Sequence, residues 1–343
     1  MAERILTIKH LRKLFPIRSK GFFSRVIGHV NAVNDISFEL NAGETLGLVG
    51  ESGCGKSTTG NCILRLLDPT SGDVIFKTRE GQELNLAHMR MSDIQPFRRD
   101  MQMVFQDPYS SLNPRMNVRQ IITEPVFIYE KPSPSELQDR AEELMKKVGL
   151  PPEYLTRYPH AFSGGQRQRI GIARAIALNP RFVVCDECVS SLDVSVQAQV
   201  LSLLEDLQQE YGMSYLFIAH DLSAVKHIAD RVAVMYIGKI VEICETEELY
   251  EHPMHPYTEA LLASVPKLSG DKSQRKVTLE GEVPDPSNPP SGCFFHTRCP
   301  YATEECAHCS QELMPIDPSD PEGHRTTCIR WKELSLKGVR TDD

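Results

Sequence analysis

The residues with the clearest chemical potential form segment 50–58, which matches the phosphate-binding pattern G-x-x-x-x-G-K-[ST] at every position. Glycines in such a loop allow backbone conformations that other residues avoid, so that successive N–H groups can point toward phosphate oxygens. Lys56 adds a positive charge for the β- and γ-phosphates, and Ser57 adds a hydroxyl for Mg²⁺. We therefore expect a nucleoside triphosphate to be bound by Gly50, Glu51, Ser52, Gly53, Cys54, Gly55, Lys56, Ser57 and Thr58.

The flanks of this segment place it between a strand and a helix. Residues 45–49 form a short apolar run typical of a buried strand, and residues 58–67 have the pattern of a helix. A helix that starts after such a loop presents the positive end of its dipole to a bound anion. The alternative is a glycine-rich turn with an ordinary surface lysine, which does not need this context.

Two acidic residues follow a second apolar run. Residues 182–185 are predicted as a buried strand, and Asp186 and Glu187 come directly after it. At the carboxyl end of a strand beside a phosphate-binding loop, one carboxylate can hold Mg²⁺ through its water shell and the next can polarise an attacking water. We expect Asp186 to organise the metal and Glu187 the water. Two solvated acids at a strand end are the alternative.

A third segment combines small and polar residues in front of a predicted helix. Phe162 is followed by Ser163, Gly164, Gly165 and Gln166. A serine and two glycines at a helix start can bind an anion through free backbone N–H groups. The same residues could also serve as a helix cap alone.

Strands and helices must alternate to position these segments. The predicted strands are residues 3–9, 33–40, 72–76, 101–105, 181–185 and 214–219, and the predicted helices are residues 136–148, 194–211 and 222–229. Residues 20–31 are predicted as a loop, and residues 115–178 as a helical insert. This order predicts a mostly parallel sheet with helices on both faces, preceded by antiparallel strands.

Composition narrows the class of protein. The chain has 343 residues, a net charge of −8 and no dense lysine–arginine run, which argues against a nucleic-acid partner. It has no apolar signal core at its start and no stretch that approaches the roughly 18 apolar residues of a membrane span, so we expect a soluble, cytoplasmic chain. Five of the ten cysteines crowd into residues 293–328 after a Pro-rich run, which favours a metal site over disulfides.

Taken together, the motifs resemble those of the ATP-binding cassette (ABC) ATPases. Residues 50–58 resemble the family's Walker A loop, residues 162–166 its signature segment and residues 182–187 its Walker B strand. Gln106 matches the glutamine loop and His220 the switch histidine, in the family's order along the chain. The resemblance implies an ATPase that uses ATP and Mg²⁺.

The resemblance also implies a fold. It is a P-loop NTPase of ABC type, with a mostly parallel sheet core, an antiparallel β subdomain and a helical subdomain that carries the signature segment. We expect the cassette over residues 1–264, with the helical subdomain at about residues 107–178. Residues 265–343 would form a linker and a small Cys-rich extension.

Members of this family work as head-to-tail dimers, in which the signature segment of one chain covers the ATP on the phosphate loop of the other. The resemblance places Asp193 in the D-loop at this interface. It further implies that Phe15 stacks on adenine, that Gln106 senses Mg²⁺ and the attacking water, and that His220 contacts the γ-phosphate. For His220 alone, a buried structural histidine is the alternative.

Several positions depart from the family pattern or leave an assignment open. Phe22 and Phe23 compete with Phe15 as the adenine-stacking residue. Phe162 replaces the usual leucine of the signature segment, and Cys188 replaces the usual proline after Walker B. Cys188 forms a C-x-x-C pair with Cys185, which could be redox-active or metal-binding, but we favour a packed, inert Cys185.

Within the family, the chain resembles the ATPase subunits of oligopeptide and dipeptide importers. Residues 105–114, 252–258 and 292–300 carry this resemblance. It implies two transmembrane permease subunits, an extracytoplasmic substrate-binding protein and a second ATPase subunit, most simply a paralogue. The chain would lie peripherally on the cytoplasmic face of the membrane. Import of nickel or glutathione, and a soluble ABC ATPase without a transport role, remain alternatives.

The tail has the cysteine spacing C-x₅-C-x₆-C-x₂-C-x₁₈-C. The importer resemblance implies that Cys293, Cys299, Cys306 and Cys328 are the metal ligands, and it gives Cys309 no role. Widely spaced thiolates suit a [4Fe–4S] cluster, while Cys309 and the histidines at positions 296, 308 and 324 keep zinc open. Buried cysteines without a ligand are the third possibility.

Overall fold

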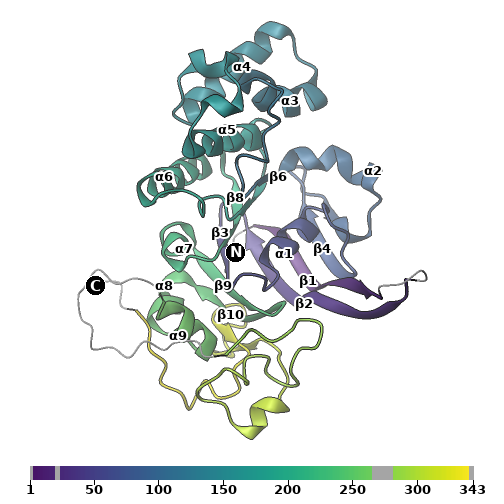
Figure 1. Ribbon diagram of the computed structural model, residues 1–343, viewed down its shortest axis with the longest axis vertical. Coiled ribbons are helices and arrows are strands. Elements are labelled where there is room, and N and C mark those ends of the chain that lie inside the picture. Colours follow the sequence, from purple (N-terminus) through teal and green to yellow (C-terminus); the bar gives the residue numbers. More distant parts are fainter. Residues whose placement is uncertain (1–2, 20–23, 265–280, 340–343) are drawn as a thin grey trace. The chain divides into compact units, whose positions relative to one another are not determined.

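The computed structural model describes residues 3–19, 24–264 and 281–339 (Figure 1). The chain divides into two compact units. Unit 1 comprises Met1–Leu6, Glu39–Thr45 and Ile75–Ala219, and unit 2 comprises Thr7–Phe38, Leu46–Val74 and His220–Asp343. Both units combine strands with helices, as the ABC fold class predicts.

Three parallel strands form the core of unit 1: β6 (Met101–Val104), β7 (Phe182–Asp186) and β8 (Ser214–Ala219). β7 lies in the middle and is hydrogen-bonded to β6 on one side and to β8 on the other. Every residue of β7 and β8 is buried, which is why both read as continuous apolar runs. The predicted parallel core is confirmed, and the carboxyl ends of β6 and β7 meet at one edge.

The predicted helical insert is also confirmed in unit 1. Figure 1 shows α3 (Val118–Glu130), α4 (Pro134–Lys147) and α5 (Gly164–Ile176) gathered together. Each of the three begins with a capping box, in which an Asn or Ser side chain and the Gln or Glu three residues later satisfy backbone N–H groups reciprocally. The other elements of this unit are β5 (Glu83–Asn85), η1 (Leu86–His88), α2 (Met91–Ile94), η2 (Gln95–Asp100), η3 (Pro152–Thr156), η4 (Pro159–Ala161) and α6 (Val194–Tyr211).

Unit 2 contains the strand that leads into the phosphate loop. β3 (Thr45–Val49), whose residues from Leu46 onward belong to this unit, runs parallel to β9 (Arg231–Tyr236). β10 (Lys239–Glu245) is antiparallel to β9, and β12 (Arg325–Thr326) is antiparallel to β10. β11 (Met314–Pro315) pairs with β12. Two short strands of the C-terminal tail therefore extend the sheet that carries the phosphate loop.

A second sheet begins near the N-terminus. β1 (Arg4–Arg18) lies between β2 (Val26–Asn41) and the start of β4 (Ser71–Lys77), and the end of β4 pairs antiparallel with β5. The prediction of a loop over residues 20–31 was wrong from Val26 onward. The first residues of β2 are largely exposed on both faces, so they lack the alternation by which a strand is recognised.

The helices of unit 2 are short: α1 (Lys56–Ile63), α7 (Leu222–Ile228), α8 (Thr246–Glu251), α9 (Pro256–Leu262) and η5 (Glu304–Ala307). The helix predicted over residues 58–67 begins and ends earlier than expected. It ends because Arg65 adopts a positive φ of 53°, which breaks the helical hydrogen-bond pattern. Across residues 3–19, 24–264 and 281–339, no helix is long and apolar enough to span a bilayer.

Candidate functional site

The glycine-rich segment forms a loop between β3 and α1, as predicted. Gly50 and Gly55 have positive φ angles of 151° and 109°. A Cβ atom on Gly50 would lie 2.1 Å from the carbonyl oxygen of Met235, and one on Gly55 would lie 2.0 Å from that of Ala32. Both positions therefore require glycine because of conformation and of close packing.

Lys56 is buried at the start of α1. Its Nζ donates hydrogen bonds to the carbonyl oxygens of Gly50, at 2.8 Å, and Glu51, at 3.0 Å. The loop thus curls around the ammonium group, which places the charge where the N–H groups of such a loop hold an anion. The other predicted phosphate-binding residues lie on the same loop or in the first turn of α1: Ser52, Gly53, Cys54, Ser57 and Thr58.

At the edge where β6 and β7 end in unit 1, the structure brings Gln106 and Glu187 together. Gln106 Nε2 donates to Glu187 Oε2 at 2.6 Å. Glu187 has a positive φ of 45°, a conformation that a non-glycine residue adopts at a cost of about 1 kcal/mol or more. Its backbone N–H donates to the carbonyl oxygen of Ile218 on β8, which holds the turn in place. Such strain is typical of positions that are fixed for function.

Asp186 is the last residue of β7 and is 7% exposed. Glu187, which follows it, is half-buried, and Gln106 is exposed. The edge therefore offers one enclosed and one accessible carboxylate side by side, together with an amide. This is a donor set that suits Mg²⁺ and water rather than a soft metal.

The predicted signature segment forms the N-terminus of α5. Ser163 caps the helix by accepting from the N–H of Gln166, whose Oε1 accepts from the N–H of Ser163 at 3.0 Å. Phe162 is buried and meets Tyr154 edge to face. Gly164 is exposed, while a Cβ atom on Gly165 would lie 2.4 Å from Val196 on α6. The segment is both a cap and an accessible helix N-terminus, so the two predicted roles are compatible.

Asp193 caps the helix that follows β7. Its side chain accepts from the N–H of Val196 at 3.0 Å, at the start of α6. The neighbouring Val194 is 83% exposed. The region predicted as a dimer contact thus presents both a fixed turn and an exposed apolar group.

The remaining predicted site residues of unit 2 are exposed. His220 follows β8 directly and precedes α7, so it is not a buried structural histidine. Phe15 lies on β1 with 36% of its surface exposed, and Lys13 Nζ lies 5.0 Å from its ring centroid. Phe22 and Phe23 lie outside the described residues. An exposed ring beside a cation is available for stacking on a base.

Cys185 and Cys188 are both buried. A hydrogen bond with Cys188, together with burial, raises the pKa of the Cys185 thiol well above its usual value. The predicted packing of Cys185 inside its strand is confirmed, and its inertness stays a prediction.

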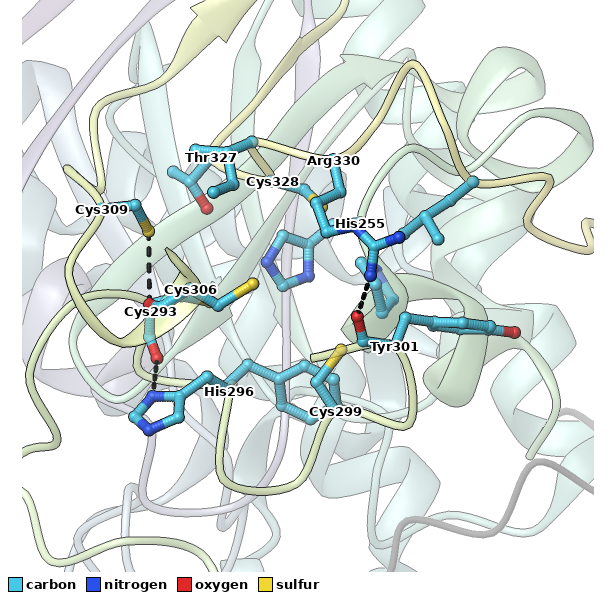
Figure 2. A pocket seen from close by; sticks show the side chains of 14 residues that line it. His255, Cys293, His296, Cys299, Tyr301, Cys306, Cys309, Thr327, Cys328 and Arg330 are labelled. Atoms are coloured by element: carbon cyan, nitrogen blue, oxygen red, sulfur yellow. Dashed lines mark hydrogen bonds between the residues drawn. The ribbon is translucent and has the colours of Figure 1, made fainter. Parts of the chain in front are cut away.

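The five tail cysteines line a single cavity in unit 2 (Figure 2). Burial raises the pKa of Cys293 to about 12, of Cys299 to about 11 and of Cys328 to about 12. Neighbouring cysteines add to each shift because thiolates would repel one another. Cys309 differs, since its Sγ donates to the backbone carbonyl oxygen of Cys306 at 3.4 Å.

His255 contributes a second type of group to this cavity. It is 1% exposed, and its Nδ1 accepts from the backbone N–H of Tyr257 at 3.1 Å. Burial lowers the pKa of His255 to about 3, so the ring is neutral and carries its proton on Nε2. That buried N–H has no hydrogen-bond partner among the described residues. A buried donor without a partner costs about 1–3 kcal/mol, so an acceptor is needed in this cavity.

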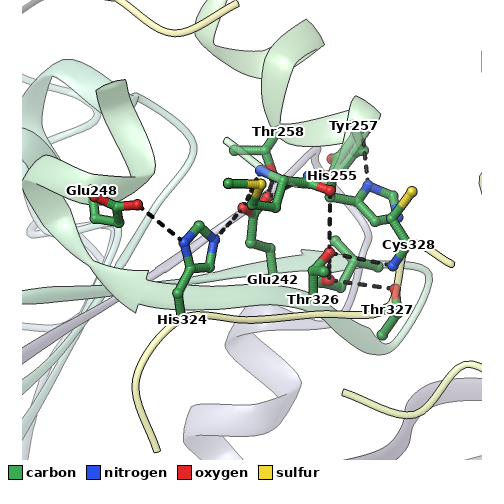
Figure 3. Close-up of polar contacts among 11 residues, drawn as sticks. Glu242, Glu248, His255, Tyr257, Thr258, His324, Thr326, Thr327 and Cys328 are labelled. Carbon is green, nitrogen blue, oxygen red and sulfur yellow. Dashed lines mark hydrogen bonds and ion pairs between the residues drawn. The ribbon is translucent and has the colours of Figure 1, made fainter. Parts of the chain in front are cut away.

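The tail histidines separate into different environments. His296 lines the cysteine cavity, but its Nδ1 is engaged with the carbonyl oxygen of Cys293 at 2.7 Å. His308 is exposed. His324 lies away from the cysteine cavity, where its Nε2 meets Glu242 Oε1 at 2.8 Å (Figure 3).

Glu242 is a fully buried carboxylate that sequence reasoning did not single out. It accepts hydrogen bonds from the backbone N–H groups of Met254 and His255, from the hydroxyl of Thr258 and from His324 (Figure 3). Glu242, Cys244 and His324 have potential metal ligand atoms within 4.8 Å of one another. Because its oxygens already accept four hydrogen bonds, Glu242 acts as a structural hub that joins β10, α9 and the tail.

A scan against protein families matches two models. The model described as "ABC transporter" matches residues 33–190, and the model described as "Oligopeptide/dipeptide transporter, C-terminal region" matches residues 241–306. The first covers the phosphate loop, the glutamine, the signature segment and the acidic edge. The second covers β10, α9 and the first part of the cysteine-rich tail.

Similar proteins extend the match to nearly the whole chain. The oligopeptide transport ATP-binding protein AppF of Bacillus subtilis is 52% identical over 319 residues, which cover 92% of this chain and 95% of that protein. The di/tripeptide transport ATP-binding protein DppF of Pseudomonas aeruginosa is 47% identical over 317 residues, with the same coverage. A dimeric post-hydrolysis structure of the ATP-binding cassette MJ0796 with ADP and Pi superimposes with a TM-score of 0.61 at 26% identity, over 71% of this chain and 99% of that one.

Proposed function

Because this chain belongs to the ABC transporter family and is an ATPase of that type, we propose that it is the ATP-hydrolysing subunit of a membrane importer of oligopeptides or dipeptides. The observation that carries this proposal is the match to peptide-transport ATP-binding proteins across both the cassette and the C-terminal region. The cassette alone would support the ATPase but not the cargo.

The chemistry of the site supports the following proposed roles in hydrolysis. The N–H groups of residues 50–58 and the ammonium group of Lys56 would hold the triphosphate, with Ser57 and Asp186 supporting Mg²⁺. Glu187 would orient and polarise the attacking water, because its accessible carboxylate is fixed by Gln106 at 2.6 Å. In this proposal the Gln106 amide senses Mg²⁺ and the attacking water, and His220 contacts the γ-phosphate.

A second ATPase chain completes each site in this proposal. The accessible N-terminus of α5, with Ser163, Gly164, Gly165 and Gln166, would cover the ATP held by the partner. Asp193 would lie at the same interface, and Phe15 would stack on adenine. A paralogous partner is the simplest arrangement. ATP turnover that rises steeply with chain concentration supports a shared site, whereas a full rate from the isolated monomer contradicts it.

The assembly would place the chain on the cytoplasmic face of a cell membrane, bound to two permease subunits, with a substrate-binding protein on the other side. Purification of the tagged chain from membranes tests this assembly directly, because multi-span proteins should be recovered with it. ATP-dependent uptake into vesicles then tests the cargo. Uptake of labelled dipeptides or oligopeptides is expected, and uptake of nickel or glutathione in their place would contradict the peptide assignment.

We further propose that Cys293, Cys299, Cys306 and Cys328 hold a [4Fe–4S] cluster. The residues fit such a group, because the buried Cys306 and the half-buried Cys293, Cys299 and Cys328 line one cavity, and the unpartnered Nε2–H of His255 needs an acceptor there. When bound, the cluster would supply cross-links between segments of a tail that has few regular elements. It would stabilise the tail without taking part in ATP hydrolysis.

The spacing of the thiols along the sequence favours a cluster over zinc, because only Cys306 and Cys309 form a close C-x₂-C pair. Tetrahedral zinc with Zn–S distances of about 2.3 Å would draw its sulfur ligands to about 3.8 Å from each other. In a cluster each thiolate binds a different iron, which suits wider spacing. Cys309 is not assigned as a ligand, since its thiol is engaged with Cys306.

A further inference from the structure

Arg298, in the cysteine-rich tail, forms an ion pair with a residue of the phosphate loop. Arg298 donates from Nη1 to Glu51 Oε2 at 2.8 Å and from Nη2 to Glu51 Oε1 at 3.2 Å. Glu51 is the second residue of the glycine-rich loop, directly after Gly50. This two-pronged geometry between a guanidinium and a carboxylate is the strong and directional form of an ion pair.

The pair is enclosed rather than a surface contact. The Arg298 side chain is 5% exposed and that of Glu51 is 25% exposed. Arg298 Nη1 also lies 3.3 Å from the hydroxyl oxygen of Tyr236 on β9. Removing the arginine would therefore leave a partly buried carboxylate without its counter-charge.

The backbone of Glu51 is fixed from two other directions. Its N–H donates to the hydroxyl of Tyr257 at 2.8 Å, and its carbonyl oxygen accepts from Lys56 Nζ at 3.0 Å. Tyr257, Lys56 and the tail arginine together hold residue 51 in place.

Aromatic packing holds Arg298 in position. Phe295, three residues earlier in the tail, is 1% exposed and packs against both Tyr236 and Tyr257, with ring centroids 5.4 Å apart in each case. The same two tyrosines contact Arg298 and Glu51. The tail segment thus packs against the phosphate loop and its neighbouring strand through one aromatic cluster and one ion pair.

From this geometry we propose that Arg298 is a positioning residue for nucleotide binding, which acts through Glu51. It would hold the loop in the shape that accepts phosphates, and it would neutralise a carboxylate that would otherwise repel them. The proposal rests on nucleotide binding by segment 50–58 and is independent of the cargo.

The test is a fluorescence titration of the full-length chain with a fluorescent ATP analogue and Mg²⁺. Arg298→Gln is expected to raise the Kd by about tenfold, since it leaves the Glu51 charge unpaired. In a Glu51→Gln background the same Arg298→Gln change is expected to alter the Kd by less than about twofold, because the charge that it would expose is absent. Equal effects of Arg298→Gln in both backgrounds would overturn the proposal.

Two further variants keep the test interpretable. Arg330→Gln removes another tail arginine, whose partners are the carbonyl oxygen of Tyr301 and the carboxylate of Glu333, and it is expected to leave the Kd within about twofold of wild type. A Kd raised equally by Arg330→Gln would show general loosening of the tail and contradict a specific role. Lys56→Ala serves as the benchmark. If it binds like wild type, the loop assignment itself fails, whereas its loss of binding combined with an unchanged Arg298→Gln variant overturns only the present proposal.

Discussion

The acidic edge of unit 1 and the tail of unit 2 use charged side chains in opposite ways. At the edge, the polar groups of Gln106 and Glu187 sit at the ends of buried strands and remain accessible. In unit 2, Glu242 on β10 and Arg298 in the tail are enclosed, and their charges are engaged by protein partners. The first arrangement leaves a carboxylate available for chemistry, and the second uses charge to connect segments.

This difference predicts different effects for substitutions in the two regions. A group at the edge can be changed with little loss of packing, because its scaffold is the buried β6 and β7. A group in the tail cannot, because the described part of the tail has two two-residue strands and one helical turn, and it depends on side-chain contacts for its position. Substitutions at the edge should therefore change turnover, and substitutions in the tail should change stability.

The largest effect is expected from Glu187→Gln. The amide keeps the size of the side chain but cannot polarise water, so ATP turnover of the assembled complex should fall by about 1,000-fold while ATP is still bound. The melting temperature should stay close to that of wild type. Steady-state phosphate release measures the turnover, and Glu210→Gln, at an exposed position on α6, is the matched control. Near wild-type turnover in Glu187→Gln would remove the carboxylate from the mechanism.

Glu242→Ala should show the reverse pattern. It leaves the N–H groups of Met254 and His255 without their acceptor and lowers the free energy of unfolding by about 3 kcal/mol. Chemical denaturation measures this loss. Glu248→Ala is the control, since Glu248 is 45% exposed and contacts His324 at 3.6 Å, and it should cost less than about 1 kcal/mol. Equal losses in the two variants would contradict the role of Glu242 as a hub.

Cys299 and Cys309 both line the cysteine cavity, but only Cys299 is assigned as a cluster ligand. After anaerobic purification, wild type and Cys309→Ser should contain about four irons and four sulfides per chain, whereas Cys299→Ser should contain at least about tenfold less. Iron, sulfide and zinc analysis with a visible spectrum measures this. Colourless protein with stoichiometric zinc would replace the cluster by zinc, and metal-free protein with a folded tail would remove the metal altogether.

A smaller effect is expected in the signature segment. Gly165→Ala would place a Cβ atom 2.4 Å from Val196 Cγ1 and should lower stability by about 1 kcal/mol. Adding Val196→Ala should restore part of this loss by making room. Thermal unfolding of the single and double variants measures the coupling, and an additive loss would show that the two helices do not meet at this point.

Local patterns predicted the edge well. β8 and α6 have the expected bounds, 214–219 and 194–211, because buried apolar runs and a 3.6-residue period are visible within a short window. The phosphate loop, the capped α5 and the acids after β7 were equally readable, since each is a motif of neighbouring residues. Whether these residues act as assigned stays a prediction.

The tail could be predicted only in part. Its cysteines pointed to a shared site, but His255, Glu242 and Arg298 carried no local signal of their contacts. Arg298 and Glu51 are 247 positions apart, and Glu242 meets His324 across 82 positions. Such contacts depend on how β10, α9 and the tail pack, and no periodicity within a short window encodes that.

ATP hydrolysis by this chain is proposed to drive peptide import through membrane partners. The most direct test is ATP turnover by the complete transporter in proteoliposomes, measured with and without peptide delivered by the substrate-binding protein. Turnover is expected to rise when peptide is supplied and to be abolished by Glu187→Gln. Turnover that is the same with and without peptide and permeases would contradict the claim.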